Sequence, residues 1–497
     1  MPDKVSRQAG GLRSFRLVCS PDQVPFVEAL LRAQSFDFET EPFFPLARKL
    51  TREPLPLGSS LAALFGYIYI QDRSSMLPPL ALAPRKGAAV LDMCASPGSK
   101  TGLLGQLVGP EGFVLGNEPG KARLATLRRN LQLLNLLCCC TASFPGEALP
   151  LAEGAWEYIQ LDPPCSGWGT VEKNPQVLRL WQGDKIRPLI ALQRRLLAEA
   201  ARLLAPGGRL VYSTCTTNTE ENEDQIRYAQ EELGLLFVPL SEPAGFSFAD
   251  PARPEFTGAL RVDTGRGGQG FFIALLQKPA SAPVETKLPL PVACRPDQTG
   301  AHQTGLAAAS RTESLKHGFF VRPWEKESRF VGERSRYGER GRSGRKRQGH
   351  ATGAAAEYLP LAALESAYAE PALLPPGDIA VFNGIAHFLP AARRDRITEK
   401  TAWKGFVLGK MGKQGDVRLN PHLRALMPEA QAAEERAWPL INLEDIALLL
   451  PLIQGQGLGL KGGSARGAQS SEAGLYYRGL PLCRLTIKGR RAMLPPG

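Results

Sequence analysis

Short apolar runs alternate with helical runs between residues 60 and 278, and this alternation restricts the fold more than any other feature of the chain. Two of the helical runs are amphipathic, 121–134 and 186–204, and the first has leucines at regular helical spacing. Five runs have the length and composition of strands: 88–91, 112–116, 156–161, 209–213 and 270–276. Strands that alternate with helices build a mostly parallel sheet covered by helices. The sequence therefore predicts an α/β domain over residues 60–278.

The flanking regions differ from this domain in composition. Residues 1–59 form a separate N-terminal segment, and residues 279–355 are typical of a linker, because Pro, Ala, Thr and Gln dominate their first part. A last block, 356–497, contains strand-like runs at Asp378–Phe382 and Gly405–Leu408. At roughly 100 to 200 residues per domain, a chain of 497 residues is expected to hold two to four domains.

The formal charge favours a polyanionic partner. Sixty Lys and Arg against 48 Asp and Glu leave a net charge of +12. Half of that excess lies in Arg322–Arg347, which holds ten basic residues against four Glu. This segment is either a solvated linker or an arm that lies along the phosphates of a nucleic acid, with its aromatic residues stacking on unpaired bases.

Several classes of protein are disfavoured. The N-terminus lacks the apolar core of a signal peptide, and the apolar stretch 440–453 is broken by Glu444 and Asp445. Nine cysteines, three of them consecutive, are not the paired framework of a small secreted protein. We expect a cytoplasmic monomer that does not bind a membrane. All five histidines lie at or after His302, so the chemistry of the first 300 residues uses no local histidine and no zinc site.

The loop after the first strand can approach a ligand. It runs from Asp92 to Thr101 and contains Gly98, which lets the backbone come close, before a helix whose first N–H groups are unpaired. It lacks the spacing of dinucleotide-binding and P-loop motifs. Glu118 follows the second strand, where an acidic side chain can accept hydrogen bonds from both hydroxyls of a ribose. An exposed turn glutamate is the alternative.

Two cysteines follow neighbouring strands. Cys165 lies in Asp162-Pro163-Pro164-Cys165-Ser166-Gly167, and Cys215 in Ser213-Thr214-Cys215-Thr216. Both segments are expected at the carboxyl edge of the sheet, where α/β folds bind their ligands. Each cysteine alone is more often a small buried apolar residue. Two cysteines about fifty residues apart, without histidine, offer too few ligands for a metal.

One chemistry uses every unusual residue at this edge. A thiolate adds to C6 of a pyrimidine, which makes C5 electron-rich and able to accept an electrophilic methyl group. Asp162 near N3 of the base would stabilise charge on the ring. A second cysteine, or a water molecule that it holds, could then remove the C5 proton so that the first thiol leaves.

In their order and spacing, three motifs together resemble the S-adenosylmethionine-dependent RNA cytosine-5 methyltransferases of the Nop2/Sun (RsmB/RsmF) family, most of all the bacterial RsmF type that acts on 16S rRNA. They are Asp92-Met93-Cys94-Ala95-Ser96-Pro97-Gly98-Ser99-Lys100-Thr101, Asp162-Pro163-Pro164-Cys165-Ser166-Gly167, and Ser213-Thr214-Cys215-Thr216 with Glu220-Glu221-Asn222-Glu223. The resemblance implies a Rossmann-like class I methyltransferase domain over 60–278, with an N-terminal RNA-binding segment. It also implies that S-adenosylmethionine is the cofactor.

Roles carried over from the family follow the same motifs. The resemblance implies that Cys215 is the nucleophile, that Cys165 assists release of the product, and that Asp162 lies between cofactor and base. It implies that Glu118 holds the ribose of the cofactor. The residues implied to wrap its methionine are Cys94, Ala95, Ser96, Pro97, Gly98, Ser99 and Lys100.

The sequence departs from the family at two places. A third cofactor-binding acid is expected near residues 143–145, where the chain has Ser143-Phe144-Pro145, and the Arg-Val-Asn signature of the N-terminal segment is absent. The end of the chain, with Gly479-Leu480-Pro481-Leu482 and Lys488-Gly489-Arg490-Arg491, resembles the PUA-like RNA-binding domain of RsmF-type enzymes, an α+β or β-barrel fold. This favours a folded rRNA as the partner.

Other functions stay open at this point. The same reaction on tRNA is compatible with the core motifs. A catalytically silent RNA-binding factor for ribosome assembly is favoured by the missing third acid. A DNA cytosine methyltransferase would use a Pro-Cys dipeptide such as Pro164-Cys165, but Cys215 would then have no task.

Overall fold

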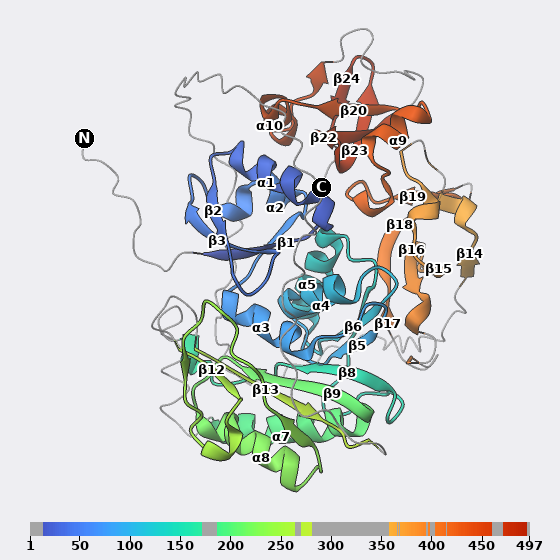
Figure 1. The fold of residues 1–497 in the computed structure, drawn as a ribbon. Helices are drawn as coiled ribbons and strands as arrows, with labels where there is room; N and C mark the ends of the chain where they lie inside the picture. Colours follow the sequence, from blue (N-terminus) through green and yellow to red (C-terminus); the bar gives the residue numbers. More distant parts are fainter. Residues whose placement is uncertain are drawn as a thin grey trace, which may run out of the picture. The chain divides into compact units, whose positions relative to one another are not determined.

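A ten-stranded mixed sheet forms the centre of the computed structural model (Figure 1). Its middle is parallel, and the chain runs from β5 outward to β6 and β7 before it returns to β8 on the other side of β5. The five parallel strands, in spatial order, are β9 (Leu204–Thr214), β8 (Trp156–Leu161), β5 (Ala89–Asp92), β6 (Phe113–Asn117) and β7 (Cys139–Ala142). The strand order thus reverses between β5 and β8, and sheets of this kind bind ligands at the carboxyl ends of the strands beside that reversal.

Antiparallel strands extend both edges of this sheet. Beside β9 lie β13 (Phe271–Gln277), β12 (Leu260–Val262) and β11 (Phe248–Ala249), and β10 (Leu236–Val238) pairs with β13. At the other edge β17 (Trp403–Lys404), from the last block of the chain, pairs with β7. The predicted mostly parallel α/β domain is therefore present, and its sheet continues into the C-terminal region.

Helices cover both faces of the sheet (Figure 1). One face packs on α3 (Arg73–Leu82), α4 (Ser99–Val108) and α5 (Lys121–Leu134). The other face packs on α7 (Ile186–Leu203) and α8 (Glu223–Glu231). The four leucines of α5 at positions 124, 127, 131 and 134 are all buried, which confirms the predicted apolar face of that helix.

A four-stranded antiparallel sheet precedes the central one. Its order is β2 (Asp37–Thr40), β3 (Ala47–Arg52), β1 (Ser14–Leu17) and β4 (Ile68–Ile70), and it is accompanied by α1 (Val24–Arg32) and α2 (Leu61–Leu64). Strand β4 lies beyond residue 59 but pairs with β1, so the N-terminal sheet extends past the predicted boundary.

The C-terminal block contains two five-stranded sheets. The first holds β14 (Glu357–Leu359), β15 (Gly377–Phe382), β16 (Ile385–Pro390), β18 (Phe406–Met411) and β19 (Val417–Leu419). The second holds β20 (Leu440–Leu443), β22 (Glu472–Tyr477), β23 (Leu480–Lys488), β24 (Arg491–Met493) and β21 (Leu458–Gly459). Two short helices, α9 (Ala430–Glu435) and α10 (Leu449–Ile453), complete the block. The predicted strands at 378–382 and 405–408 correspond to β15 and β18.

The structure describes residues 13–170, 186–263, 270–280, 357–459 and 471–494, apart from 365, 367, 394–395, 398–402 and 414. The predicted linker, apart from its first two residues, and the Arg-rich segment Arg322–Arg347 within it lie outside these ranges. No helix in the described ranges is long and apolar enough to cross a membrane.

Candidate active site

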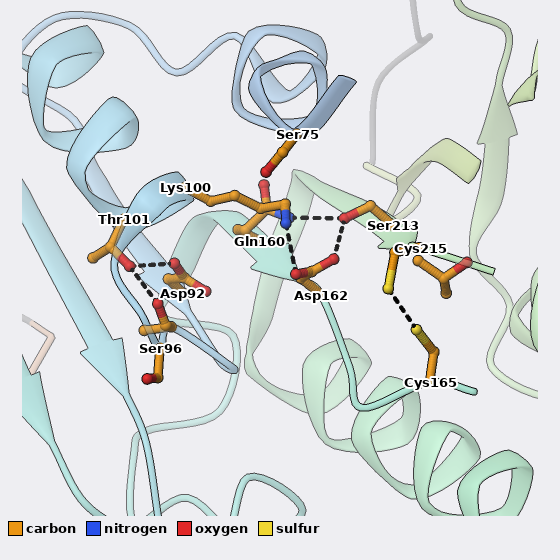
Figure 2. A network of polar contacts seen from close by, with 12 residues as sticks. Ser75, Asp92, Ser96, Lys100, Thr101, Gln160, Asp162, Cys165, Ser213 and Cys215 are labelled. Atoms are coloured by element: carbon orange, nitrogen blue, oxygen red, sulfur yellow. Dashed lines mark hydrogen bonds and ion pairs between the residues drawn. The ribbon is translucent and has the colours of Figure 1, made fainter. Parts of the chain in front are cut away.

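The first strand of the parallel core ends at a buried carboxylate. Asp92, the last residue of β5, is 1% exposed, and its Oδ2 accepts a hydrogen bond of 2.7 Å from Thr101 Oγ1 (Figure 2). Thr101 Oγ1 also lies 3.2 Å from the carbonyl oxygen of Ala95, so one hydroxyl joins the strand end, the loop and helix α4. Burial raises the pKa of Asp92 to about 7, although the hydrogen bond from Thr101 opposes this.

An ion pair spans the two strands at the reversal of the sheet. Lys100 Nζ, in the first turn of α4, lies 2.6 Å from Oδ2 of Asp162, which follows β8. Ser213 on β9 donates a hydrogen bond of 3.0 Å to the other oxygen of Asp162. Figure 2 shows these three side chains converging from three elements. Asp162 is thereby held in one orientation while 28% of its side chain stays exposed.

The two cysteines meet beside this ion pair. Cys165 Sγ and Cys215 Sγ are 3.2 Å apart, although fifty positions of sequence separate them (Figure 2). Both are partly exposed, so a ligand can reach them. The predicted convergence of the segments after β8 and β9 is what the structure shows.

The environments of the two thiols shift their pKa values in opposite directions. The hydrogen bond from Cys165 lowers the pKa of Cys215 below the usual thiol value, and Lys100 adds to this effect, while burial and Asp162 oppose it. The pKa of Cys165 is well above that value, first because its proton is held by Cys215 and then because of burial. Cys215 is therefore the more acidic thiol of the pair.

Helix α5 fixes the conformation of the loop between β5 and α4. Gly98 has a φ of +103°, a left-handed conformation that favours glycine, and a Cβ built on it would lie 3.0 Å from Cδ1 of Leu127. Asn130 donates a hydrogen bond to the carbonyl oxygen of Pro97, and Ser96 Oγ donates one to that of Arg123. Both partners belong to α5, so this helix fixes the course of the loop. Gly98 provides no side-chain cap for α4.

Glu118 lies directly after β6, at the same edge of the sheet. Its side chain is 2% exposed, Oε1 accepts a hydrogen bond of 2.8 Å from the N–H of Gly120, and Oε2 pairs with Arg123 at 3.2 Å. Each carboxylate oxygen can accept more than one hydrogen bond. The carboxylate is thus oriented by the protein and retains acceptor capacity for a diol.

At the position of the missing third acid, backbone hydrogen bonds to an asparagine are found. Asn117, the last residue of β6, receives a hydrogen bond from the N–H of Phe144 and donates one to its carbonyl oxygen, both 3.0 Å long. This double contact fixes Ser143–Pro145 through the backbone, and Phe144 packs against the core of the domain. The site therefore has an apolar and amide environment where an acid was expected.

Comparison with known proteins agrees with this geometry. Residues 79–277 match the family model of the 16S rRNA methyltransferase RsmB/F. Residues 79–277 belong to the RsmB/F methyltransferase family. Ribosomal RNA small subunit methyltransferase F of Cronobacter sakazakii is 40% identical over 233 residues, which are 46% of this chain and 48% of that protein. The protein of the same name from Shewanella amazonensis is 40% identical over 234 residues, 45% of this chain and 49% of its own.

A solved structure of a methyltransferase homologue from Pyrococcus horikoshii is 33% identical, with a TM-score of 0.47, and the match covers 55% of this chain and 88% of that one. The chain spans about half the length of the curated relatives that it matches.

S-adenosylmethionine, which the sequence predicted as the cofactor, is the methyl donor of the RsmB/F domain, and the residues present fit it. The uncapped start of α4 and the left-handed Gly98 allow close approach of a ligand. The carboxylate of Glu118 retains acceptor capacity that fits the hydroxyls of a ribose. The structure adds contacts that the motifs did not reveal. The ammonium of Lys100 lies against Asp162, and Ser213 and Glu221 take part in the hydrogen bonds around the cysteines.

Proposed function

We propose that this chain transfers a methyl group from S-adenosylmethionine to C5 of a cytidine in ribosomal RNA, most specifically in 16S rRNA, through a covalent bond between Cys215 and C6. The observation that supports this most strongly is the pair of sulfurs 3.2 Å apart, beside the ion pair of Lys100 and Asp162. A methyl transfer that needed no covalent step would have no use for two adjacent thiols.

The residues divide the work as follows. Bound S-adenosylmethionine supplies an electrophilic methyl group. Cys215, the more acidic thiol, forms the bond to C6, and the electron pair of the C5–C6 double bond becomes available at C5. Asp162 and its partner Lys100 face the ring and balance the charge that develops there. After methylation, the C5 proton is taken by Cys165, once it has released its own thiol proton to solvent, or by a water molecule that Cys165 holds. The C–H electron pair then restores the double bond, and Cys215 leaves.

The rest of the chain supports RNA as the substrate. We propose that the N-terminal sheet and the two C-terminal sheets, including a PUA-like module, bind the RNA and choose the cytidine. A second binding module raises the effective concentration of the target at the active site. The target base must leave its stack before a thiol can reach C6. The eight described cysteines are all unpaired, which supports a reaction in the cytoplasm.

The decisive experiment is covalent trapping. The protein is incubated with S-adenosylmethionine and rRNA that carries 5-azacytosine or 5-fluorocytosine, and a protein–RNA adduct is sought by denaturing electrophoresis. Wild-type protein should form the adduct, and Cys215→Ala should form none. Cys165→Ala should accumulate an adduct even on unmodified RNA, because release is blocked.

The competing functions give different results. An adduct that depends on Cys165 and survives Cys215→Ala would reverse the two roles. Preference for tRNA over rRNA in the same assay would move the substrate to tRNA. RNA binding without any methyl incorporation would indicate the silent assembly factor that the missing third acid favours.

A further inference from the structure

A buried carboxylate outside the reacting groups joins the two cysteine segments. Glu221, in the short 3-10 helix Thr219–Glu221 after β9, is 0% exposed. It touches neither sulfur. Its two oxygens instead receive four hydrogen bonds from side chains and backbone around the cysteines.

Two of these hydrogen bonds fix the residue that follows Cys165. The N–H of Ser166 donates to Oε2 of Glu221 at 2.9 Å, and Ser166 Oγ donates to Oε1 at 2.5 Å. Helix α7 fixes the other side of Cys165, because Nε2 of Gln193 lies 3.0 Å from Oε2 of Glu221 and 2.9 Å from the carbonyl oxygen of Pro164. The backbone of Cys165 is therefore held on both sides by one carboxylate and one amide.

The segment of Cys215 is bound to the same group. Asn218 donates a hydrogen bond of 3.3 Å to Oε1 of Glu221. Thr216, the residue after Cys215, shares a hydrogen bond of 2.8 Å with Ser166 Oγ. Each cysteine is thus followed by a hydroxyl residue. The two hydroxyls contact each other, and that of Ser166 also contacts the carboxylate.

We propose that Glu221 is a positioning residue that sets the separation of the Cys165 and Cys215 sulfurs, and that this separation controls both adduct formation and product release. The second half of this inference rests on the proposed function. All four donors to the carboxylate are uncharged, so Glu221 orients two loops through hydrogen bonds. Misplacement of a reacting group by about 1 Å can lower a rate on the order of 100-fold.

Glu221→Gln tests this with little change of volume. The amide keeps one acceptor oxygen and replaces the other with a donor, which must face either the N–H of Ser166 or the amide of Asn218. The matched control is Glu232→Gln, an exposed glutamate at the end of α8. Circular dichroism and calorimetric binding of S-adenosylmethionine establish that each variant is folded.

The first measurement needs neither cofactor nor RNA. Dibromobimane bridges two thiols only when they lie a few ångströms apart, and the Cys165–Cys215 bridged peptide is quantified by mass spectrometry. We expect the bridged fraction to fall several-fold in Glu221→Gln and to stay at the wild-type level in Glu232→Gln. Ser166→Ala, which loses the hydroxyl link but keeps the carboxylate, should show a smaller decrease and decides the matter if Glu221→Gln does not fold.

The second measurement follows methyl transfer. The kcat of Glu221→Gln should fall on the order of 10- to 100-fold, with KM for S-adenosylmethionine unchanged, because the cofactor loop is not in this network. Wild-type bridging in a folded Glu221→Gln, and in Ser166→Ala, would overturn the inference. If wild-type protein methylates no RNA but bridging still depends on Glu221, the proposed function fails and the positioning role stands.

Discussion

At the scale of single residues, one hydrogen bond between two thiols gives them different pKa values. Cys165 and Cys215 have the same chemistry, but only Cys215 has its pKa lowered, first by the hydrogen bond from Cys165 and further by Lys100. The thiolate is the reactive form of cysteine. The hydrogen bond from Cys165 therefore favours the thiolate form of Cys215.

Alkylation of Cys215 measures this dependence. The rate with iodoacetamide, followed at Cys215 by peptide mass spectrometry, should rise with pH as the thiolate forms, with a midpoint below the usual thiol value. Cys165→Ala removes the hydrogen bond that lowers the pKa of Cys215 and should therefore move the midpoint upward. Cys19→Ala is the control, since burial raises the pKa of that distant thiol to about 12. An unchanged midpoint in Cys165→Ala would contradict the shared-proton explanation.

Asp92 should make stability depend on pH. Its pKa is about 7 in the folded protein against 3.8 ordinarily, so between these values the folded state holds a proton that the unfolded state has lost. Wild-type stability from this group therefore falls as pH rises from about 4 to about 7. Asp92→Asn does not titrate there, so its free energy of unfolding relative to wild type should increase across that window, by on the order of 4 kcal/mol.

Urea denaturation at several pH values measures the difference. Asp22→Asn, at an exposed position of the N-terminal region, is the control and should show no comparable trend. A difference between Asp92→Asn and wild type that does not vary with pH would rule out a raised pKa at Asp92.

At the scale of elements, periodicity predicted the helices better than the strand at one edge. Helix α5 has the predicted bounds, because its leucine spacing is a strong signal. Strand β7 was not predicted, since Cys139 and Cys140 gave no alternation, yet they are buried between β6 and β17. Strand β9 begins at Leu204, five residues early, because Pro206 and the glycines after it suggested a turn.

The same limit applies to the site. The motifs placed Asp162, Cys165 and Cys215 at one edge because the carboxyl ends of parallel strands share that edge. They did not predict that Lys100 reaches Asp162 across 62 positions of sequence, or that Glu221 contacts Ser166 across 55. Such contacts depend on the packing of α4 and α7, which no local pattern encodes.

Helix α5 should support the cofactor loop through one leucine. Leu127 is fully buried and lies beneath Gly98 and Gly116. Leu127→Ala should cost about 2 to 5 kcal/mol of stability and weaken S-adenosylmethionine binding, because the loop loses its support. Thermal unfolding and calorimetry measure the two effects. Thr126→Ala, on the exposed face of the same helix, should change both by little. Wild-type cofactor affinity in a folded Leu127→Ala would show that the loop holds its shape alone.

At the scale of the molecule, the C-terminal block is joined to the methyltransferase domain and the N-terminal sheet by hydrogen bonds as well as by apolar packing. One apolar core contains residues of the N-terminal sheet and of the second C-terminal sheet. Gln132 on α5 exchanges two hydrogen bonds with the backbone of Val407. The regions proposed to choose the RNA are therefore attached directly to the domain proposed to modify it, which fixes the distance between recognition and chemistry.

Arg424 is the strongest of these connections. Its guanidinium is buried and donates to four carbonyl oxygens, those of Phe65, Gly66, Leu133 and Leu134, at the ends of α2 and α5. Cations at helix C-termini are stabilising, because the last carbonyl groups have no partner within the helix. The guanidinium also lies 4.2 Å from the ring of Tyr67.

Arg424→Ala should therefore loosen the C-terminal block without touching the active site. Four carbonyl groups lose their donor, and each one that stays buried without a partner costs about 1 to 3 kcal/mol, so the free energy of unfolding should fall by several kcal/mol. Limited proteolysis should cut the region after residue 357 faster than in wild type. Arg418→Ala, at an exposed position of β19, is the control and should leave the stability and the rate of proteolysis unchanged.

If the C-terminal block binds the RNA and the methyltransferase domain modifies it, Arg424→Ala should raise KM for RNA more than it lowers kcat. The cysteines and the cofactor loop do not depend on Arg424 for their positions. A fall in kcat with an unchanged KM for RNA would instead mean that the C-terminal block acts on the chemical step itself.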